Sequence, residues 1–149
     1  MTKKIRVKAM CLIEHKGKLL LCNGYDSVRK EKLLRVVGGS IDFEEKAEDA
    51  VRREIKEELG SNLENLKFIT VIENIFTYEG ERGHEVIFLY KGDLTNKDIY
   101  NTEKVPILDR REDWKDAEWI PISDILEKKT IFYPSFDYKK LFSELFSSN

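Results

Sequence analysis

Three glutamates, Glu54, Glu57 and Glu58, lie within five residues of one another in a segment whose pattern predicts a helix. Apolar residues recur at helical spacing over residues 46–59, and Gly60 is a typical C-terminal cap. At about 100° per residue, all three carboxylates fall on one face of that helix. Because like charges on one face repel, either water screens this cluster or a positive group binds among the three side chains.

The same helical wheel sets the glutamates beside the packed side of the helix. Small and aliphatic residues lie within about 60° of Glu54 on the wheel, namely Ala47, Ala50 and Val51. The predicted solvent side carries other charged residues, Asp49, Arg52 and Lys56. Partly buried, unpaired carboxylates are costly, and a divalent cation removes that cost. Carboxylate oxygens are suitable ligands for Mg²⁺ or Mn²⁺, so the cluster indicates a metal site. The residues leave one alternative open, namely that the glutamates form salt bridges on the surface.

Two glycines, Gly38 and Gly39, precede this helix and directly follow an apolar run at residues 33–37. The run predicts a short strand that stops at the glycines. Glycine lets the backbone take unusual angles and approach a ligand closely, so a backbone carbonyl here could face the glutamates and complete a metal shell. A pair of glycines is also common in ordinary turns.

The remaining pattern predicts strands and helices without regular alternation, and therefore a mixed sheet with helices on both faces. A hairpin is expected over residues 5–22, followed by a polar loop over residues 23–32. The later elements are strands at 66–78, 84–94 and 116–122, a hairpin loop at 79–83, a helix at 123–129 with Ser123 as its N-cap, and a core-packed helix at 137–146.

The composition and charge of the chain indicate which classes of binding partner to expect. The 149 residues carry a net charge of −2 at a sequence pI of about 5.8, which gives no basic footprint for nucleic acid. No apolar run reaches the ~20 residues of a membrane span, and no signal peptide is expected at the start of the chain. Cys11 and Cys22 are expected to be buried, reduced thiols. These observations predict a cytoplasmic protein, argue against a nucleic-acid partner and leave a small phosphorylated ligand open, and they do not determine whether the protein is a homodimer.

The spacing around the glutamates resembles the Nudix box, whose signature is G-x5-E-x7-R-E-U-x-E-E-x-G-U, where U is aliphatic. The chain supplies every fixed residue of this signature and its first aliphatic residue, as Gly39, Glu45, Arg53, Glu54, Ile55, Glu57, Glu58 and Gly60. Ser61 stands at the final aliphatic position. In these residues the chain is similar to the Nudix (MutT-like) hydrolase family.

The resemblance implies a fold of the α/β (α+β) class, the Nudix-type α/β/α sandwich with a mixed β-sheet, with residues 1–149 forming a single Nudix hydrolase domain. It also implies a Mg²⁺-dependent pyrophosphohydrolase, with Mn²⁺ as an alternative metal. The substrate would be a nucleoside diphosphate linked to another moiety, attacked at a pyrophosphate phosphorus by a metal-activated water. A non-catalytic Nudix-like sensor of a nucleotide or nucleotide sugar is the main competing function, and an isomerase or RNA-decapping variant is a third.

The resemblance also assigns roles to residues of the box. The implied catalytic set is Glu45, Arg53, Glu54, Glu57 and Glu58. The backbone carbonyl of Gly38 would join the three helix glutamates as a metal ligand. Arg53 would pair with Glu45 and orient the carboxylates, although an ordinary surface salt bridge would look the same in the sequence.

The general base and the substrate-binding residues are less constrained. Glu54 is the first candidate for the base, and acids outside the box are further candidates: Glu73, Glu85, Glu112 and Asp113. Arg35 is expected to contact a phosphate, and Phe76 and Tyr78 to stack on a base. The ordinary alternatives are surface solubility for the arginine and core packing for the two aromatic rings.

Overall fold

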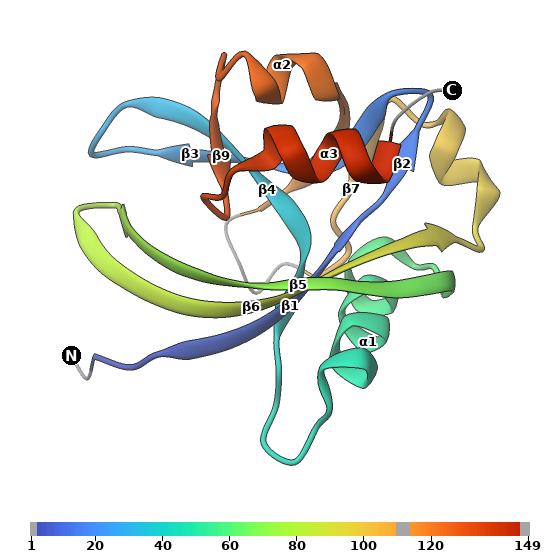
Figure 1. Cartoon of the computed structure of the whole chain (residues 1–149), viewed down its shortest axis with the longest axis horizontal. Helices are drawn as coiled ribbons and strands as arrows, with labels where there is room; N and C mark the ends of the chain where they lie inside the picture. Colours follow the sequence, from blue (N-terminus) through green and yellow to red (C-terminus); the bar gives the residue numbers. More distant parts are fainter. Residues whose placement is uncertain (1–2, 110–113, 147–149) are drawn as a thin grey trace.

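The computed structural model describes residues 3–109 and 114–146 of the chain. Its strands form one mixed sheet, in the order β5-β6-β1-β4-β3-β8-β7, with β2 paired to β3 and β9 paired to β4 (Figure 1). The strands are β1 (Arg6–Leu12), β2 (Glu14–His15), β3 (Lys18–Asp26), β4 (Glu31–Ser40), β5 (Leu63–Tyr78), β6 (Glu81–Leu94), β7 (Lys104–Pro106), β8 (Asp116–Pro121) and β9 (Ile131–Tyr133). The helices are α1 (Ala47–Leu59), the 3₁₀ helix η1 (Lys97–Asn101), α2 (Ile122–Leu126) and α3 (Tyr138–Phe146).

Helices cover both faces of the strands, with α1 on one side and α2 and α3 on the other (Figure 1). Alternate residues of β1 supply the two cores, because successive side chains of a strand point to opposite faces. Cys11 packs in the core of α1, whereas Met10 packs in the core that includes Phe142 of α3. The β1–β6 and β4–β9 pairs are parallel and the other pairs antiparallel. The expected mixed sheet between helices is therefore confirmed.

The prediction of a hairpin over residues 5–22 was wrong for its first strand. β1 pairs with β4 and β6, and only the short β2 forms a hairpin with β3. The polar loop expected over residues 23–32 was also wrong, because β3 and β4 continue through most of it and leave only residues 27–30 as a turn. Long-range strand pairing overrides local polarity here, since an exposed hairpin tip accepts polar side chains on both faces.

Two further boundaries differ from the expectation. β4 does not stop at the glycines but runs through both of them to Ser40, where its final residues pair with β1. Helix α2 begins at Ile122, directly after Pro121, and has no side-chain cap, so Ser123 is not the N-cap. The last helix packs as predicted, because Tyr138 and Phe142 are buried in the second core.

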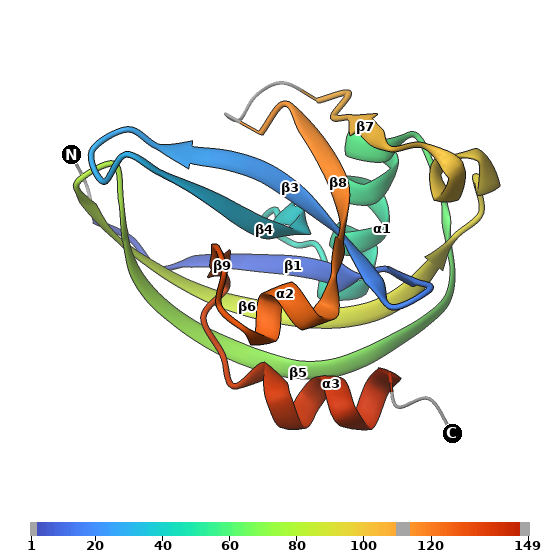
Figure 2. The same ribbon diagram turned by 90° about the horizontal axis from the view of Figure 1, so that it is seen from above.

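The tips of two hairpins meet at one end of the molecule (Figure 2). The backbone N–H of Ser27, in the β3–β4 turn, donates to the Glu79 carboxylate of the β5–β6 turn at 2.9 Å. In return, the Glu79 N–H donates to Asp26 at 3.2 Å, and the Tyr78 hydroxyl donates to the Tyr25 carbonyl at 3.3 Å. These contacts connect the tips of the two hairpins.

Cys11 and Cys22 are both buried, as expected, and form no disulfide with each other, and burial raises the pKa of the Cys11 thiol. Neither thiol is placed to react with solvent, because both side chains are fully buried in the core. Within the two described ranges, no helix has the length and apolar character needed to cross a membrane.

Candidate active site

Helix α1 turns Glu54 and Glu58 toward the interior of the protein. The helix ends at Gly60, which adopts the left-handed conformation and donates its N–H to the Lys56 carbonyl at 3.0 Å. Glu54 and Glu58 are buried, with 9% and 5% of their surface exposed, and Glu57 is half-buried beside them. The residues expected on the solvent side are exposed, namely Asp49, Arg52 and Lys56. The sequence therefore predicted the orientation of the carboxylate face correctly.

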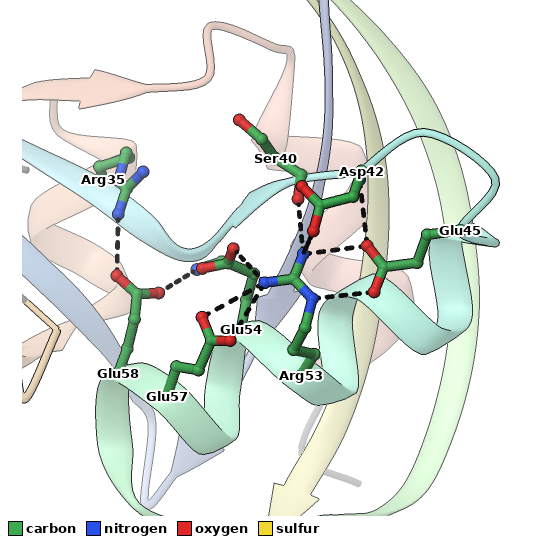
Figure 3. A network of polar contacts seen from close by, with 9 residues as sticks. Arg35, Ser40, Asp42, Glu45, Arg53, Glu54, Glu57 and Glu58 are labelled. Atoms are coloured by element: carbon green, nitrogen blue, oxygen red, sulfur yellow. Dashed lines mark hydrogen bonds and ion pairs between the residues drawn. The ribbon is translucent and has the colours of Figure 1, made fainter. Parts of the chain in front are cut away.

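Arg53 holds two of the three glutamates in place. One of its terminal nitrogens, Nη1, donates to Glu54 at 2.9 Å and to Glu57 at 3.2 Å (Figure 3). Its Nε and Nη2 bind the two oxygens of Glu45 at 2.8 and 2.9 Å, and Nη2 also donates to the Ser40 carbonyl at 3.0 Å. The structure thus contains the expected Arg53–Glu45 pair, in the two-pronged geometry that only a guanidinium provides.

The loop before α1 folds Glu45 back toward the helix. The Glu45 N–H donates to the Asp42 carbonyl, and the Asp42 N–H donates to the Glu45 carboxylate, both at 3.0 Å. The hydrogen bond from Arg53, together with that from the Asp42 backbone, lowers the pKa of Glu45 from about 4.5 to about 2. Glu45 therefore keeps its charge, and its hold on Arg53, well into the acid range.

This shift predicts how stability depends on pH. Because the pKa of Glu45 is lower in the folded protein, its stabilisation is complete above about pH 4.5 and is lost as the pH falls through about 2. We expect Glu45→Gln to lower the free energy of unfolding at neutral pH, and the gap to the wild type to close in strong acid. Urea denaturation at several pH values measures this gap, and a gap that stays constant between about pH 7 and pH 2 would contradict the assignment.

Glu58 lies in a second ion pair, on the other side of the cluster. Its carboxylate is 3.6 Å from Nη2 of Arg35, and it accepts the Gly38 N–H at 3.2 Å (Figure 3). Both charged side chains of this pair are almost fully buried. The guanidinium of Arg35 also lies over the Trp114 ring, 4.7 Å from its centroid. Arg35, which the sequence offered as a phosphate contact, therefore links Glu58 to an aromatic ring.

Gly38 and Gly39 let the backbone pass close to this cluster. Gly38 has φ +144°, and a Cβ there would lie 2.2 Å from the Ala9 carbonyl oxygen. A Cβ on Gly39 would lie 2.4 Å from the Glu54 carboxyl group. The contact that the structure gives Gly38 is through its N–H, so the carbonyl role expected for Gly38 stays a prediction.

The backbone at Gly38 predicts a large effect on stability. We expect Gly38→Ala to lower the free energy of unfolding by about 2–4 kcal/mol, because it combines a strained φ with a collision against backbone. Gly17→Ala is the matched control, since Gly17 also has a positive φ but open space around it. Urea denaturation compares the two variants, and an equal loss in both would show that the close approach at Gly38 is unimportant.

The donor set of the cluster fits a hard divalent cation, because three carboxylates lie together on one partly buried face. Their present orientation is set by the two arginines. In the part of the chain that the structure describes, no three acidic, histidine or cysteine side chains already converge as a metal shell. Binding a cation therefore requires at least Glu54 and Glu57 to turn from the shared Nη1 of Arg53.

A cavity of about 650 Å³ adjoins the carboxylate cluster. Arg35 lines this cavity, whereas Glu54, Glu57 and Glu58 are not among its described lining residues. Phe76 and Tyr78, which the sequence offered as stacking residues, also line it. The cavity and the cluster are therefore neighbours that meet at the Arg35–Glu58 pair.

Two more aromatic residues line the cavity, Trp114, which the sequence did not single out, and Tyr133. Trp114 lies nearly parallel to Tyr78, at 20° and 6.5 Å between ring centroids, and Tyr133 lies 5.4 Å from Phe76. The signal for Trp114 was a large aromatic residue in an otherwise polar loop before a strand. Its partners lie on β4 and β5, so its role depends on contacts that are distant in the sequence.

The candidates for the general base fall into different surroundings. Glu73 is exposed and is absent from the described lining of the cavity. Glu85 lines the cavity and forms an ion pair with Lys8 at 3.4 Å. Glu54 is held by Arg53 in the cluster. Glu112 and Asp113 lie outside the described residues.

A comparison with known proteins identifies a family whose profile matches this chain. A family profile described as NUDIX domain matches residues 3–139. The MutT NUDIX hydrolase of Burkholderia pseudomallei is 21% identical, with a TM-score of 0.59 over 97% of this chain and 100% of that chain. A MutT protein of Bacillus halodurans is 19% identical, with a TM-score of 0.58 over 97% and 84%. An ADP compounds hydrolase is 23% identical, with a TM-score of 0.55 over 98% and 72%. At these identities, the structural matches show the same fold.

Proposed function

The chain belongs to the NUDIX domain family, and from this premise we propose that it is a Mg²⁺-dependent pyrophosphohydrolase that cleaves a nucleoside diphosphate linked to another moiety. The observation that carries this proposal is the cluster in which Arg53 joins Glu45, Glu54 and Glu57, with Glu58 beside them. A purely structural network would not need three carboxylates on one buried helix face, because each buried charge costs free energy.

In this proposal, Glu54, Glu57 and Glu58 hold the metal. Bound Mg²⁺ would neutralise charge on the pyrophosphate oxygens and lower the pKa of the attacking water. Arg53 positions Glu54 and Glu57, and Glu45 fixes the guanidinium of Arg53 from its far side. Glu54 is the proposed base, accepting the proton of the water that attacks phosphorus. Arg35 holds Glu58 and offers its positive charge at the wall of the cavity.

The cavity is the proposed place for the rest of the substrate. Tyr78 and Trp114 present nearly parallel rings, and Phe76 adds a third aromatic surface. Aromatic rings of this kind favour a nucleobase, because every base has a face that can stack on them. Arg35 contacts both Trp114 and Glu58, and this position supports a role for it in binding a phosphate.

We place the protein in the cytoplasm in this proposal. The support is that Cys11 and Cys22 are buried and form no disulfide with each other, so neither depends on an oxidising compartment. A homodimer is compatible with the proposal, and its chemistry does not require one.

The test is a substrate panel with Mg²⁺ and the purified protein. The panel contains ADP-ribose, nucleotide sugars, NADH, dinucleoside polyphosphates, nucleoside triphosphates and oxidised dGTP, with products identified by mass. We expect one class to be cleaved at its phosphoric anhydride, and chelation of the metal to stop the reaction. Tight binding of a nucleotide or nucleotide sugar without any turnover would instead support a sensor and overturn the hydrolase.

A further inference from the structure

One part of the cavity wall, formed by β1 and the residues before it, carries a row of basic residues. Lys4, Arg6, Lys8 and Met10 all line the cavity, and the last three belong to β1. Every second side chain of a strand points to the same face, so Arg6, Lys8 and Met10 lie on one face of β1. Arg6 to Met10 spans about 13 Å along the strand, at about 3.3 Å per residue.

The row starts beside the proposed catalytic centre and leads away from it. Met10 lies opposite Gly38 in the β1–β4 pairing, and Gly38 donates its N–H to Glu58. Lys8 lies opposite Ser40, whose carbonyl accepts a hydrogen bond from Arg53. From there β1 runs toward the N-terminus and away from α1 (Figure 1), so the row leads away from the helix that carries the glutamates.

The charge of the cavity differs from that of the whole chain. Among the described residues that line it, six side chains are basic and two are acidic, although the chain as a whole has a net charge of −2. The two buried cations are already matched by acids, Lys8 by Glu85 and Arg35 by Glu58. Lys3, Lys4 and Arg6 are exposed at the mouth and form no ion pair within residues 3–109 and 114–146. Arg82 and Glu81, the other exposed charged side chains of the described lining, have opposite charges, so the excess positive charge lies at the outer end of the row.

We infer that the moiety joined to the nucleoside diphosphate is itself anionic, and that Lys4 and Arg6 recognise its charge. This inference rests on the proposed function and narrows its substrate class. If the base stacks on the aromatic residues of the cavity and the pyrophosphate lies near Arg35, the second moiety lies along β1. A neutral sugar at that position would gain no electrostatic attraction from the cations. A cleft lined by charges of one sign concentrates ligands of the opposite sign. Further phosphates and a sugar carboxylate share the required chemistry.

Pairs of substrates test whether negative charge on the second moiety is recognised, and whether that charge comes from a sugar carboxylate or from further phosphates. UDP-glucuronate and UDP-glucose differ by one carboxylate on the sugar, and adenosine tetraphosphate and ADP-glucose compare added phosphates with a neutral sugar. We expect kcat/KM to favour the anionic member of at least one pair by about tenfold or more, and the pair that shows it identifies the source of charge. Equal values within both pairs would overturn the inference while leaving the hydrolase intact.

The double variant Lys4→Gln/Arg6→Gln tests the two residues. We expect it to reduce the preference for the anionic substrate about tenfold, with a weaker dependence on salt. Lys139→Gln/Lys140→Gln is the matched control, since it removes two exposed charges from α3, away from the described lining of the cavity. An unchanged preference in the Lys4/Arg6 variant, or the same loss in the control, would contradict the assignment.

A binding measurement keeps the inference testable apart from catalysis. Inorganic tripolyphosphate is titrated into each protein by calorimetry without any nucleotide. We expect the Kd to rise about tenfold in the Lys4/Arg6 variant and to stay unchanged in the control. If no nucleotide is hydrolysed but this difference is found, the proposed function fails and the anion site stands. If nucleotides are hydrolysed and the Kd is the same in all three proteins, the anion site fails alone.

Discussion

Replacing Glu57 with glutamine should lower kcat/KM for the cleaved substrate by at least about 10²-fold, the scale of losing one preorganised charged group at a reacting centre. Glu57 is the most accessible of the three helix glutamates, and its carboxylate shares Nη1 of Arg53 with Glu54. The change keeps the size of the side chain and removes one charge from the donor set. Initial rates at saturating and limiting Mg²⁺ measure the loss.

The fold should survive this substitution. Arg53 keeps its bonds to Glu45, Glu54 and the Ser40 carbonyl, so we expect the free energy of unfolding to change by no more than about 1 kcal/mol. Glu48→Gln is the control, because Glu48 lies on the same helix in an exposed ion pair with Arg52. Gross unfolding of Glu57→Gln in a thermal melt would show that the glutamate is structural.

The second large effect is expected from Arg53→Lys, although the charge is conserved. A lysine has a single ammonium group and cannot bind both oxygens of Glu45 while holding Glu54 and Glu57. We expect kcat to fall about tenfold or more, and the free energy of unfolding to fall by about 2 kcal/mol, since a partly buried charge network loses its centre.

Arg52→Lys is the matched control for this change. Arg52 is the neighbouring residue, is exposed, and donates to the Leu63 carbonyl at 3.1 Å without touching the three helix glutamates in any described contact. Urea denaturation and steady-state kinetics on both variants give the comparison. Full activity in Arg53→Lys would show that the guanidinium geometry is not needed to position the carboxylates.

The carboxylate cluster was predictable because it depends on short-range spacing. Helical periodicity alone placed Glu54, Glu57 and Glu58 on one inward face, and the box spacing indicated the Arg53–Glu45 pair. Both features lie within a single loop and helix. The structure adds what charge counting could not show, namely that two arginines already relieve the repulsion among the glutamates.

The surroundings of the cluster were less predictable because they depend on strand pairing across the chain. The sequence placed the first strand in a hairpin with its neighbour, whereas β1 pairs with β4 and, in parallel, with β6. That pairing brings Lys8 to Glu85 and sets the basic row of β1 beside the cavity. The contact of Arg35 with Trp114 likewise joins residues far apart in the chain.

The central claim is that the glutamates of α1 support attack of water on a phosphoric anhydride. The most direct test is turnover of the cleaved substrate in ¹⁸O-labelled water with Mg²⁺, for the wild type and Glu57→Gln side by side, with products weighed by mass spectrometry. We predict one ¹⁸O atom on a phosphate group of one product, formed by the wild type and almost absent with the variant. Label on a carbon-bound oxygen, or equal turnover by the variant, would contradict the claim.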